Sequence, residues 1–591
     1  MLITLTTISF LSGCLFLNKI YKISYIQTPL IYFSLIILIE YIFGVLGFLT
    51  FGYYVALTFG IILLFLLTYK NNNIFDKKNI IKVPLIFIPI LLSFITLDSH
   101  YILVEWDDFA NWGKSIKWIY DNNALYTGDA LVTIKRYPPA SQLFQYFILK
   151  TLGWKESHLI LSVNLLTISG ILFIFSYFNN QFSFKNIIGI LILFVTIFTF
   201  GYGYSDIYVD KLLGIFFSIT LVLALSSEKT KENFFLFVIT TSLLLVIKET
   251  ALILCAISLF VYFFTLFRTD INNIIYKRII LIIIFNSFFY FSWKLYLNSI
   301  GTHLEYSLPQ FHQLFEDKFI NRFSLTMHEF LRRISSKRYF AIFTILTGLL
   351  VLIKYSKFDR KILKSIYFIY FGIIIYILCL LVFYLFIFGD YEGPRLASFE
   401  RYLGSYLLAV TILVISIIWS INLKFIKIVL FALTLLIISV NFKYIKRNFP
   451  IIQNSNSDIE FRKKITNYTS ELKKYLRPGD KVYFISQHTI GYESVMFTYL
   501  NLPFASNGWC WSVGIPKDHN DVWTCPRKLE DELRGSGPYQ FIVLFSFNDS
   551  FWEPNKHLFT ISHPKKGIYV IKDENSIIKI YPLHLDDNVY K

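Results

Sequence analysis

Two adjacent carboxylates, Asp107 and Asp108, lie in a polar, aromatic-rich stretch of a chain that is otherwise mostly apolar. A carboxylate held just outside a membrane can accept a proton from an incoming hydroxyl group while a lipid-linked phosphate leaves. The same pair can also be a solvated helix N-terminus that the helix macrodipole favours. Trp106, Trp112 and Trp118 favour the catalytic interpretation, because tryptophan side chains hold a segment at the level of the lipid headgroups.

The composition indicates a polytopic α-helical membrane protein. Of the 591 residues, 55% are hydrophobic, including 62 Phe and 40 Tyr. A water-soluble domain cannot bury that much apolar surface. The apolar runs of roughly 20 residues fit helices that cross a hydrocarbon core about 30 Å thick, and we expect about 14 spans within residues 1–442. The alternating segments of a membrane β-barrel are absent.

The basic residues predict how the chain crosses the membrane. The net charge of +17 comes from Lys and Arg in short loops, which indicates a topology signal and contact with anionic membrane lipids, not nucleic acid. The three main basic clusters all face the cytoplasm only if residues 140–152 do not cross. This short segment follows Pro138-Pro139, and we expect it to be a helix at the outer interface. Both termini and the loop 99–155 then lie outside the cytoplasm.

Residues 443–591 have a different character, with apolar runs of strand length separated by turn signals. The expected elements are a helix near 457–476 and strands near 481–486, 539–547, 567–572 and 576–583. We therefore predict a small extracytoplasmic α/β domain. Cys510 and Cys525 both fall in it, which makes a disulfide between them a candidate in an oxidising compartment.

Other charged residues lie at the predicted outer ends of later helices. Lys211 is expected one turn inside the membrane, where a buried cation needs an anionic partner. Lys248 lies between two apolar runs, and such a boundary lysine commonly reaches back to the surface. Glu249 beside it is a candidate ion-pair partner.

The stretch that contains Arg395 and Arg401 supplies two arginines at the outer end of a late helix. Paired N–H donors let arginine hold a phosphate better than lysine does. A structural ion pair between Glu400 and Arg401 is the alternative.

An acidic pair in the first large outer loop, followed after about thirty residues by Tyr137-Pro138-Pro139 and a short helix, resembles the GT-C superfamily of membrane glycosyltransferases that use polyprenyl-phosphate sugars. That superfamily includes protein O-mannosyltransferases and the aminoarabinose transferases of lipid A. The resemblance covers roughly residues 80–440. Two features depart from it: three extra spans precede the acidic loop, and an Asp-Asp pair stands where many members have Asp-Glu.

The resemblance implies roles for several residues. Asp107 would be the base, with Asp108 as a second ligand or orienting group. Asp206 would lie near the donor phosphate or a divalent metal such as Mg²⁺ or Mn²⁺, although no cofactor is predicted with certainty. The alternative for Asp206 is a helix cap at the membrane interface. Lys248 would bind phosphate.

Arg401-Tyr402 looks like the arginine-tyrosine feature of the aminoarabinose transferases. The full set of candidate substrate-binding residues is Tyr137, Lys211, Lys248, Arg395, Arg401 and Tyr402.

The preferred prediction is a glycosyltransferase of a bacterial inner membrane with its catalytic face outside the cytoplasm. It would move a sugar from a polyprenyl-phosphate donor to a glycan, lipid or protein acceptor of the cell envelope. A polymerase or ligase of O-antigen or capsule is the alternative, and it would depend on late-loop arginines instead of Asp107. A transporter or flippase would show repeated halves and charges near the bilayer midplane.

Overall fold

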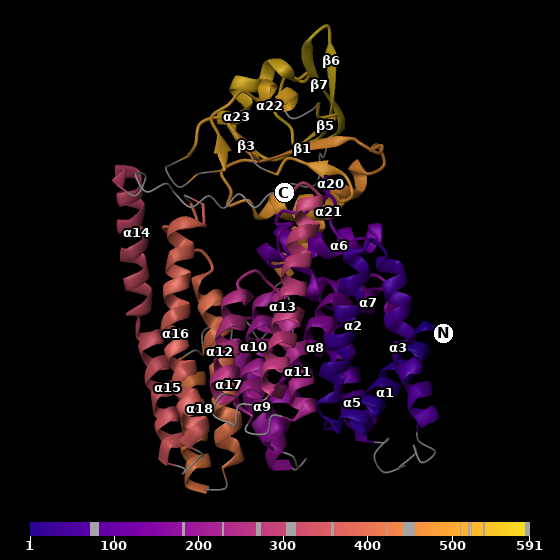
Figure 1. The fold of residues 1–591 in the computed structure, drawn as a ribbon. Coiled ribbons are helices and arrows are strands. Elements are labelled where there is room, and N and C mark those ends of the chain that lie inside the picture. Colours follow the sequence, from indigo (N-terminus) through magenta and orange to yellow (C-terminus); the bar gives the residue numbers. More distant parts are fainter. Residues whose placement is uncertain are drawn as a thin grey trace. The chain divides into compact units, whose positions relative to one another are not determined.

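The chain forms a bundle of α-helices followed by a mixed α/β part, as Figure 1 shows. The computed structural model describes residues 1–70, 82–179, 184–226, 230–266, 273–302, 315–355, 360–389, 391–421, 424–440, 442, 456–508, 510–517, 521, 523–535 and 538–585. Two compact units are present. The first contains Met1–Ile102, Ile119–Gly128 and Ile134–Ile451, and the second contains Leu103–Trp118, Asp129–Thr133 and Ile452–Lys591.

The first unit consists of helices that run alongside one another (Figure 1). They are α1 (Leu2–Tyr21), α2 (Thr28–Val45), α3 (Leu49–Lys70), α5 (Lys82–Asp98), α7 (Ala140–Leu152), α8 (Glu156–Phe178), α9 (Phe184–Ile197), α10 (Val209–Leu225), α11 (Lys231–Leu245), α12 (Ala251–Leu266), α13 (Asn273–Ser299), α14 (Asp317–Ile334), α15 (Lys337–Tyr355), α16 (Arg360–Phe386), α17 (Phe399–Ser420) and α18 (Lys424–Val440). A short 3₁₀ turn, η2 (Phe198–Phe200), follows α9. α6 (Gly113–Asn122) begins in the second unit and ends in the first.

Seven of the described helices, α1, α2, α3, α8, α13, α16 and α17, are long and apolar enough to cross a membrane, and the number is eight if the bent pair α14–α15 forms one span. The protein is therefore a polytopic helical membrane protein with a C-terminal α/β domain. Helix α10 has 17 residues, α11 has 15 and α12 has 16, so all three are shorter than the roughly 20 residues of a typical span. All of α10 is buried inside the bundle.

α7 differs from its prediction as a helix at a lipid interface. Nearly all of its side chains are buried, and it packs against α2 and α8. Its polar residues Ser141, Gln142 and Gln145 are each 2% exposed or less. The segment is short, as predicted, but it is enclosed by protein.

Close packing of α10 on α17 brings together the two helices that carry Lys211 and Arg401. A Cβ atom at Gly214 of α10 would lie 2.8 Å from the carbonyl oxygen of Ser405 on α17. A Cβ atom at Gly404 would lie 2.8 Å from the carbonyl oxygen of Phe200. Only glycine allows backbones to approach this closely, so both positions set the spacing of the helices.

The second unit contains a five-stranded sheet in the order β2-β1-β5-β6-β7. β1 (Lys481–Ser486) is parallel to both β2 (Ala505–Ser506) and β5 (Phe541–Ser546), whereas β6 (Gly567–Glu574) and β7 (Ile577–Leu585) continue the sheet antiparallel. The remaining elements are α20 (Asn456–Leu472), α21 (Tyr492–Asn501), β3 (Ser512–Val513), β4 (Thr524–Cys525), α22 (Leu529–Gly535), α23 (Asp549–Asn555) and the 3₁₀ turn η4 (Lys556–Leu558).

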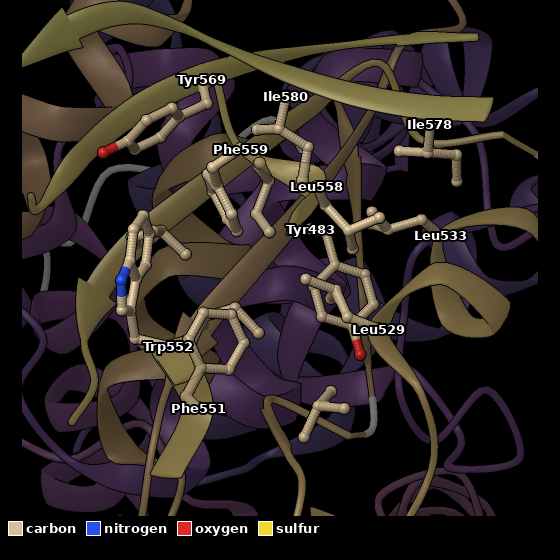
Figure 2. Packing of buried hydrophobic residues seen from close by; sticks show 14 residues of the cluster. Tyr483, Leu529, Leu533, Phe551, Trp552, Leu558, Phe559, Tyr569, Ile578 and Ile580 are labelled. Atoms are coloured by element: carbon tan, nitrogen blue, oxygen red, sulfur yellow. The ribbon is translucent and has the colours of Figure 1, made fainter. Parts of the chain in front are cut away.

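A single apolar cluster on the sheet supports this domain. Figure 2 shows Tyr483, Phe551, Trp552, Phe559 and Tyr569 packed together, and each is no more than 6% exposed. The four predicted strands correspond to β1, β5, β6 and β7, and the predicted helix corresponds to α20. The predicted domain boundary near residue 443 lies outside the described residues.

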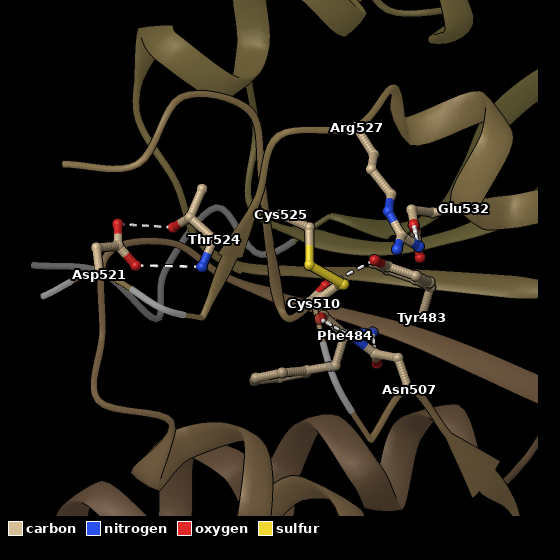
Figure 3. The surroundings of a disulfide bond; sticks show 9 residues. All are labelled: Tyr483, Phe484, Asn507, Cys510, Asp521, Thr524, Cys525, Arg527 and Glu532. Carbon is tan, nitrogen blue, oxygen red and sulfur yellow. Dashed lines mark hydrogen bonds and ion pairs between the residues drawn. A yellow bond between two sulfur atoms is a disulfide. The ribbon is translucent and has the colours of Figure 1, made fainter. Parts of the chain in front are cut away.

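The sulfur atoms of Cys510 and Cys525 are bonded, with 5.3 Å between the two Cα atoms. The bond closes a loop in which the carboxylate of Asp521 accepts hydrogen bonds from the Thr524 N–H at 3.2 Å and the Thr524 hydroxyl at 2.7 Å (Figure 3). The Lys517 N–H donates to the same carboxylate at 2.9 Å, and His488 contacts it at 3.0 Å. Asp521 therefore holds the loop from within.

These contacts lower the pKa of Asp521. Burial acts to raise it, but the hydrogen bonds from Lys517, Thr524 and His488 outweigh burial and bring the pKa below its ordinary value of 3.8. A carboxyl group whose pKa is lower in the folded state adds stability above its unfolded pKa and loses this contribution as the pH falls through the folded pKa.

We expect the replacement Gly214→Ala to lower the free energy of unfolding by about 1–3 kcal/mol, because the new methyl group meets backbone that must shift. Gly348→Ala is the matched control, since a Cβ at Gly348 has no atom within 4 Å. Thermal unfolding of the purified protein in detergent compares the two. Equal midpoints for both variants would contradict the tight contact between α10 and α17.

We expect the stability that wild type has over Asp521→Asn to be largest above about pH 4 and to shrink at lower pH, as the carboxylate takes up a proton. Hydrogen exchange of amides in residues 511–525 of the full chain measures this difference. Asp573→Asn, which changes an exposed carboxyl group on β6, is the control. A difference that is constant across this pH range would show that the charge of Asp521 does not hold the loop.

Candidate functional site

Two buried ion pairs lie at the N-terminal end of α10. The ammonium group of Lys211 is 3.0 Å from Asp206 Oδ1, and that of Lys248 is 2.6 Å from Asp210 Oδ1. All four side chains are 5% exposed or less. Lys248 therefore does not reach back to the surface.

The turn before α10 holds the first pair in place. Lys211 Nζ donates to the carbonyl oxygens of Gly203 at 3.0 Å and Asp206 at 2.9 Å, in addition to the Asp206 carboxylate. The N–H of Gly203 donates to Asp206 Oδ2. The prediction that a buried Lys211 requires an anion is thus met by a residue of the same turn.

Aromatic rings surround the second pair. Lys248 Nζ lies 4.4 Å from the ring centroid of Tyr402 and 5.5 Å from that of Tyr137. Both distances are within the range of cation–π attraction. The backbone N–H of Ala140 donates to the carbonyl oxygen of Val246 at 3.0 Å, which ties the Tyr137 segment to the turn that carries Lys248.

Arg401 connects α17 to the same end of α10. Its guanidinium lies 4.4 Å from the ring centroid of Tyr208, the residue that precedes α10, and it donates to Ser398 Oγ at 2.7 Å. Tyr202 donates to the Arg401 carbonyl oxygen at 2.7 Å, and Ser405 Oγ donates to the Asp210 carbonyl oxygen at 3.0 Å. These bonds fix Arg401 relative to Asp210.

Two predicted ion-pair alternatives turn out differently. Glu249 does not pair with its neighbour Lys248 but lies 3.4 Å from Arg136 Nε and 3.2 Å from Lys294 Nζ. Glu400 pairs with Arg333 at 3.3 Å.

Arg395 stacks on the ring of Tyr391, at 3.9 Å from its centroid, and its carbonyl oxygen accepts a hydrogen bond from Arg333. These contacts hold Arg395 in the turn before α17, and its assignment to substrate binding stays a prediction.

The cluster offers three cationic side chains to an anionic ligand. Lys211, Lys248 and Arg401 contribute the positive charges, and Asp206 and Asp210 contribute two negative ones. The buried carboxyl group of Asp98 also interacts electrostatically with Lys211. The N-terminus of α10 adds partial positive charge. Burying so many charges costs several kcal/mol per ion, so such residues inside a membrane protein are commonly functional.

The carboxylates Asp107 and Asp108 belong to the second unit. Asp108 is fully buried and begins a π-helical turn, η1 (Asp108–Trp112), while Asp107 precedes the turn and is partly exposed. π-helical turns are rare in proteins, but those that occur are often found at functional sites. Asp107 is thus the more accessible of the two carboxylates, and its role as the base stays a prediction.

Aromatic contacts hold this turn against α21. The ring of Phe109 lies 5.4 Å from that of Tyr499 and 6.1 Å from that of Tyr492. The Tyr492 hydroxyl donates to the Val104 carbonyl oxygen at 2.6 Å. Trp112 is only 4% exposed, so protein and not lipid surrounds it. Part of the predicted catalytic loop is thus packed by the C-terminal domain.

The described residues include no group of three or more His, Cys, Asp or Glu side chains that could hold a metal ion. Asp206, the candidate ligand for Mg²⁺ or Mn²⁺, has both carboxylate oxygens engaged, one by Lys211 and the other by the Gly203 N–H. The residues present at Asp206 therefore do not fit a divalent metal.

The structure brings together six of the predicted residues, Tyr137, Asp206, Lys211, Lys248, Arg401 and Tyr402. Sequence reasoning missed that Asp210 is the partner of Lys248 and that Tyr208 supports Arg401. The one available signal for Asp210 was its position in the first turn of an apolar helix, next to Lys211.

Comparisons with known proteins give one structural match to report. No family model matches the sequence, and neither does any curated protein. The crystal structure of ArnT from Cupriavidus metallidurans, solved with undecaprenyl phosphate, aligns with a TM-score of 0.46 and 11% sequence identity, over 82% of this chain and 96% of that one. Similarity at this level establishes neither a family nor an activity, so the proposal below rests on this chain's own residues.

We expect Asp210→Asn and Lys248→Met each to lower the free energy of unfolding by about 3–5 kcal/mol, because each leaves a buried charge without its partner. The free energy of unfolding of the double variant should fall by much less than the sum of the two single effects. Thermal or denaturant unfolding in detergent measures this double-mutant cycle.

Glu530 and Arg534 form the matched control pair, with side chains 37% and 43% exposed. Their coupling should stay below about 1 kcal/mol. If the buried pair shows equally small coupling, the two side chains do not form an ion pair in the folded protein.

Proposed function

We propose that this protein is a membrane glycosyltransferase that moves a sugar from a polyprenyl-phosphate donor to an acceptor outside the cytoplasm. The observation that carries the proposal is a cluster of three cationic side chains inside a membrane-embedded helical unit: Lys211 and Lys248, which are buried, and Arg401, which is partly exposed. A lipid-linked phosphate is an anion that enters from the bilayer. The sequence resemblance to the GT-C superfamily supports the same assignment.

The residues of the proposed site would have different roles in the reaction. Lys248 and Arg401 neutralise the phosphate as it leaves, which is the kind of electrostatic stabilisation that usually contributes most to catalysis. Tyr402 and Tyr137 hold the Lys248 ammonium group through their ring faces. Asp107 accepts the proton of the acceptor hydroxyl group, and Asp108 orients it.

Asp210 and Asp206 are positioning residues in this scheme. They keep the two lysines charged and fixed when no phosphate is bound, because an unpaired lysine in such a place would favour its neutral form. The sugar, the acceptor and the bacterial inner membrane as the location belong to the proposal as the sequence predicts them.

We expect Asp107→Asn to lower the rate of sugar transfer by about 10²–10⁴-fold, the usual contribution of a general base. Arg401→Ala should mainly weaken donor binding and raise KM. The assay follows labelled sugar and released polyprenyl phosphate with the purified chain in nanodiscs. Arg527→Gln, which changes an exposed side chain of the C-terminal domain, is the control.

Asp108→Asn completes the set, after each variant is shown to be folded and inserted normally. If both Asp variants retain full activity while loss of Arg401 abolishes it, the acidic pair is structural, and the polymerase or ligase alternative is correct. If none of the variants alters a measurable transfer, the proposed site is wrong.

A further inference from the structure

The carboxyl ends of β1 and β5 in the C-terminal sheet form a second place where polar side chains meet. β1 pairs with β2 on one side and with the later strand β5 on the other, and all three strands are parallel. The direction of chain progression therefore reverses at β1. In open α/β sheets, ligands bind in the crevice outside the carboxyl ends of the strands at such a reversal.

Gln487 joins the two segments that leave these strands. Its backbone N–H donates to the Ser546 carbonyl oxygen at 2.7 Å. Its side-chain amide donates to Ser550 Oγ at 2.8 Å and accepts from the Asn548 N–H at 3.0 Å. The ends of β1 and β5 are thereby held as one rigid edge.

His488 follows directly and has an uncommon backbone conformation. Its φ of 56° lies in the left-handed region, which non-glycine residues seldom adopt, although asparagine, aspartate and histidine do so more often than the others. Non-glycine residues in this region are frequent at functional sites. The imidazole is the group that this conformation positions.

Asp521 fixes the imidazole. His488 Nδ1 lies 3.0 Å from Asp521 Oδ2, and the lowered pKa of Asp521 keeps that carboxylate ionised and able only to accept. In the tautomer that this hydrogen bond assigns, Nδ1 carries the proton and Nε2 is an acceptor. The side chain is 17% exposed, so a ligand can reach it.

The neighbouring groups favour a neutral ligand with hydroxyl groups. An acceptor nitrogen selects an O–H donor, and the adjacent carboxylate of Asp521 disfavours an anion. The ring of Trp523 stacks at 4.7 Å on that of Trp511, which packs against Gly491 at the start of α21. Aromatic faces beside a few fixed polar groups are typical of small-molecule sites.

Two further hydroxyl groups at this edge indicate that a hydrogen-bonding ligand completes the site. Ser486, the last residue of β1, and Ser494, in the first turn of α21, are 0% and 2% exposed. Neither hydroxyl has a hydrogen-bond partner among the described residues. Buried polar groups normally have one.

We propose that this edge of the C-terminal domain is a binding site for a neutral carbohydrate, in which His488 Nε2 accepts a hydrogen bond from a sugar hydroxyl group and Asp521 is a positioning residue. The identification of this carbohydrate with the acceptor glycan rests on the proposed function. The C-terminal domain would then select the acceptor, separately from the cationic cluster.

The test is saturation-transfer NMR on the full chain in nanodiscs with three neutral probes: methyl α-mannoside, methyl β-galactoside and methyl N-acetyl-β-glucosaminide. At least one should give a signal with wild type. His488→Asn suits the left-handed backbone, so we expect it to fold normally and to bind the probe roughly tenfold more weakly, as expected for one lost hydrogen bond. Asp521→Asn should also weaken binding.

Glu553→Gln, which changes an exposed carboxyl group on α23, is the matched control and should bind like wild type. Absence of signal with all three glycosides, an unchanged signal in His488→Asn, or a stronger response to methyl phosphate would each overturn the carbohydrate site. Arg401→Ala separates the two proposals, because it should weaken sugar transfer through donor binding and leave the glycoside signal intact. Glycoside binding without any transfer in wild type counts against the proposed function alone.

Discussion

Burial of charge inside the helical unit is the constraint on which the rest of the site depends. Lys211 and Lys248 are almost fully enclosed, and an isolated ion in such surroundings costs several kcal/mol. Asp206 and Asp210 offset this cost only if they meet the lysines directly. That requirement ties the start of α10 to the turn before it and to the turn that carries Lys248. The close approach of α10 to α17 depends on the glycine at position 214, because any side chain there would meet the backbone of Ser405.

The C-terminal domain follows the same principle with different chemistry. There the charge to be held is the carboxylate of Asp521, and backbone and hydroxyl donors in a disulfide-closed loop hold it. A rigid anion then orients His488, much as Asp210 holds Lys248 in the helical unit. In both places a carboxylate fixes the position of a second polar group.

The sequence predicts the class of the fold well and the site in part. Apolar runs locate the long helices, and strand-length runs locate β1, β5, β6 and β7, because each signal is local. The environment of α7 could not be predicted, since whether a short apolar helix lies on lipid or inside protein depends on its neighbours. The prediction of an ion-pair partner for Lys248 was wrong for the same reason. Adjacency in sequence favoured Glu249, whereas the packing of α10 against the turn that carries Lys248 selects Asp210. The packing of Phe109 on α21 joins residues almost 400 positions apart, which no local pattern encodes.

The cationic side chains of the cluster bear on how it would act on a phosphate. A polyprenyl-phosphate sugar is a phosphodiester with one negative charge, and the leaving lipid phosphate gains a second as the bond to the sugar breaks. Extra stabilisation of the second charge then requires a cation to turn from its own carboxylate toward the phosphate, and Lys248 is the candidate because its ammonium group can pivot between Asp210 and the ring faces of Tyr402 and Tyr137. An interaction that strengthens only as charge develops lowers the barrier without tightening the donor complex, which is how binding energy becomes catalysis. In this scheme the buried carboxylates do more than stabilise the fold, because they keep the lysines charged until the transition state forms.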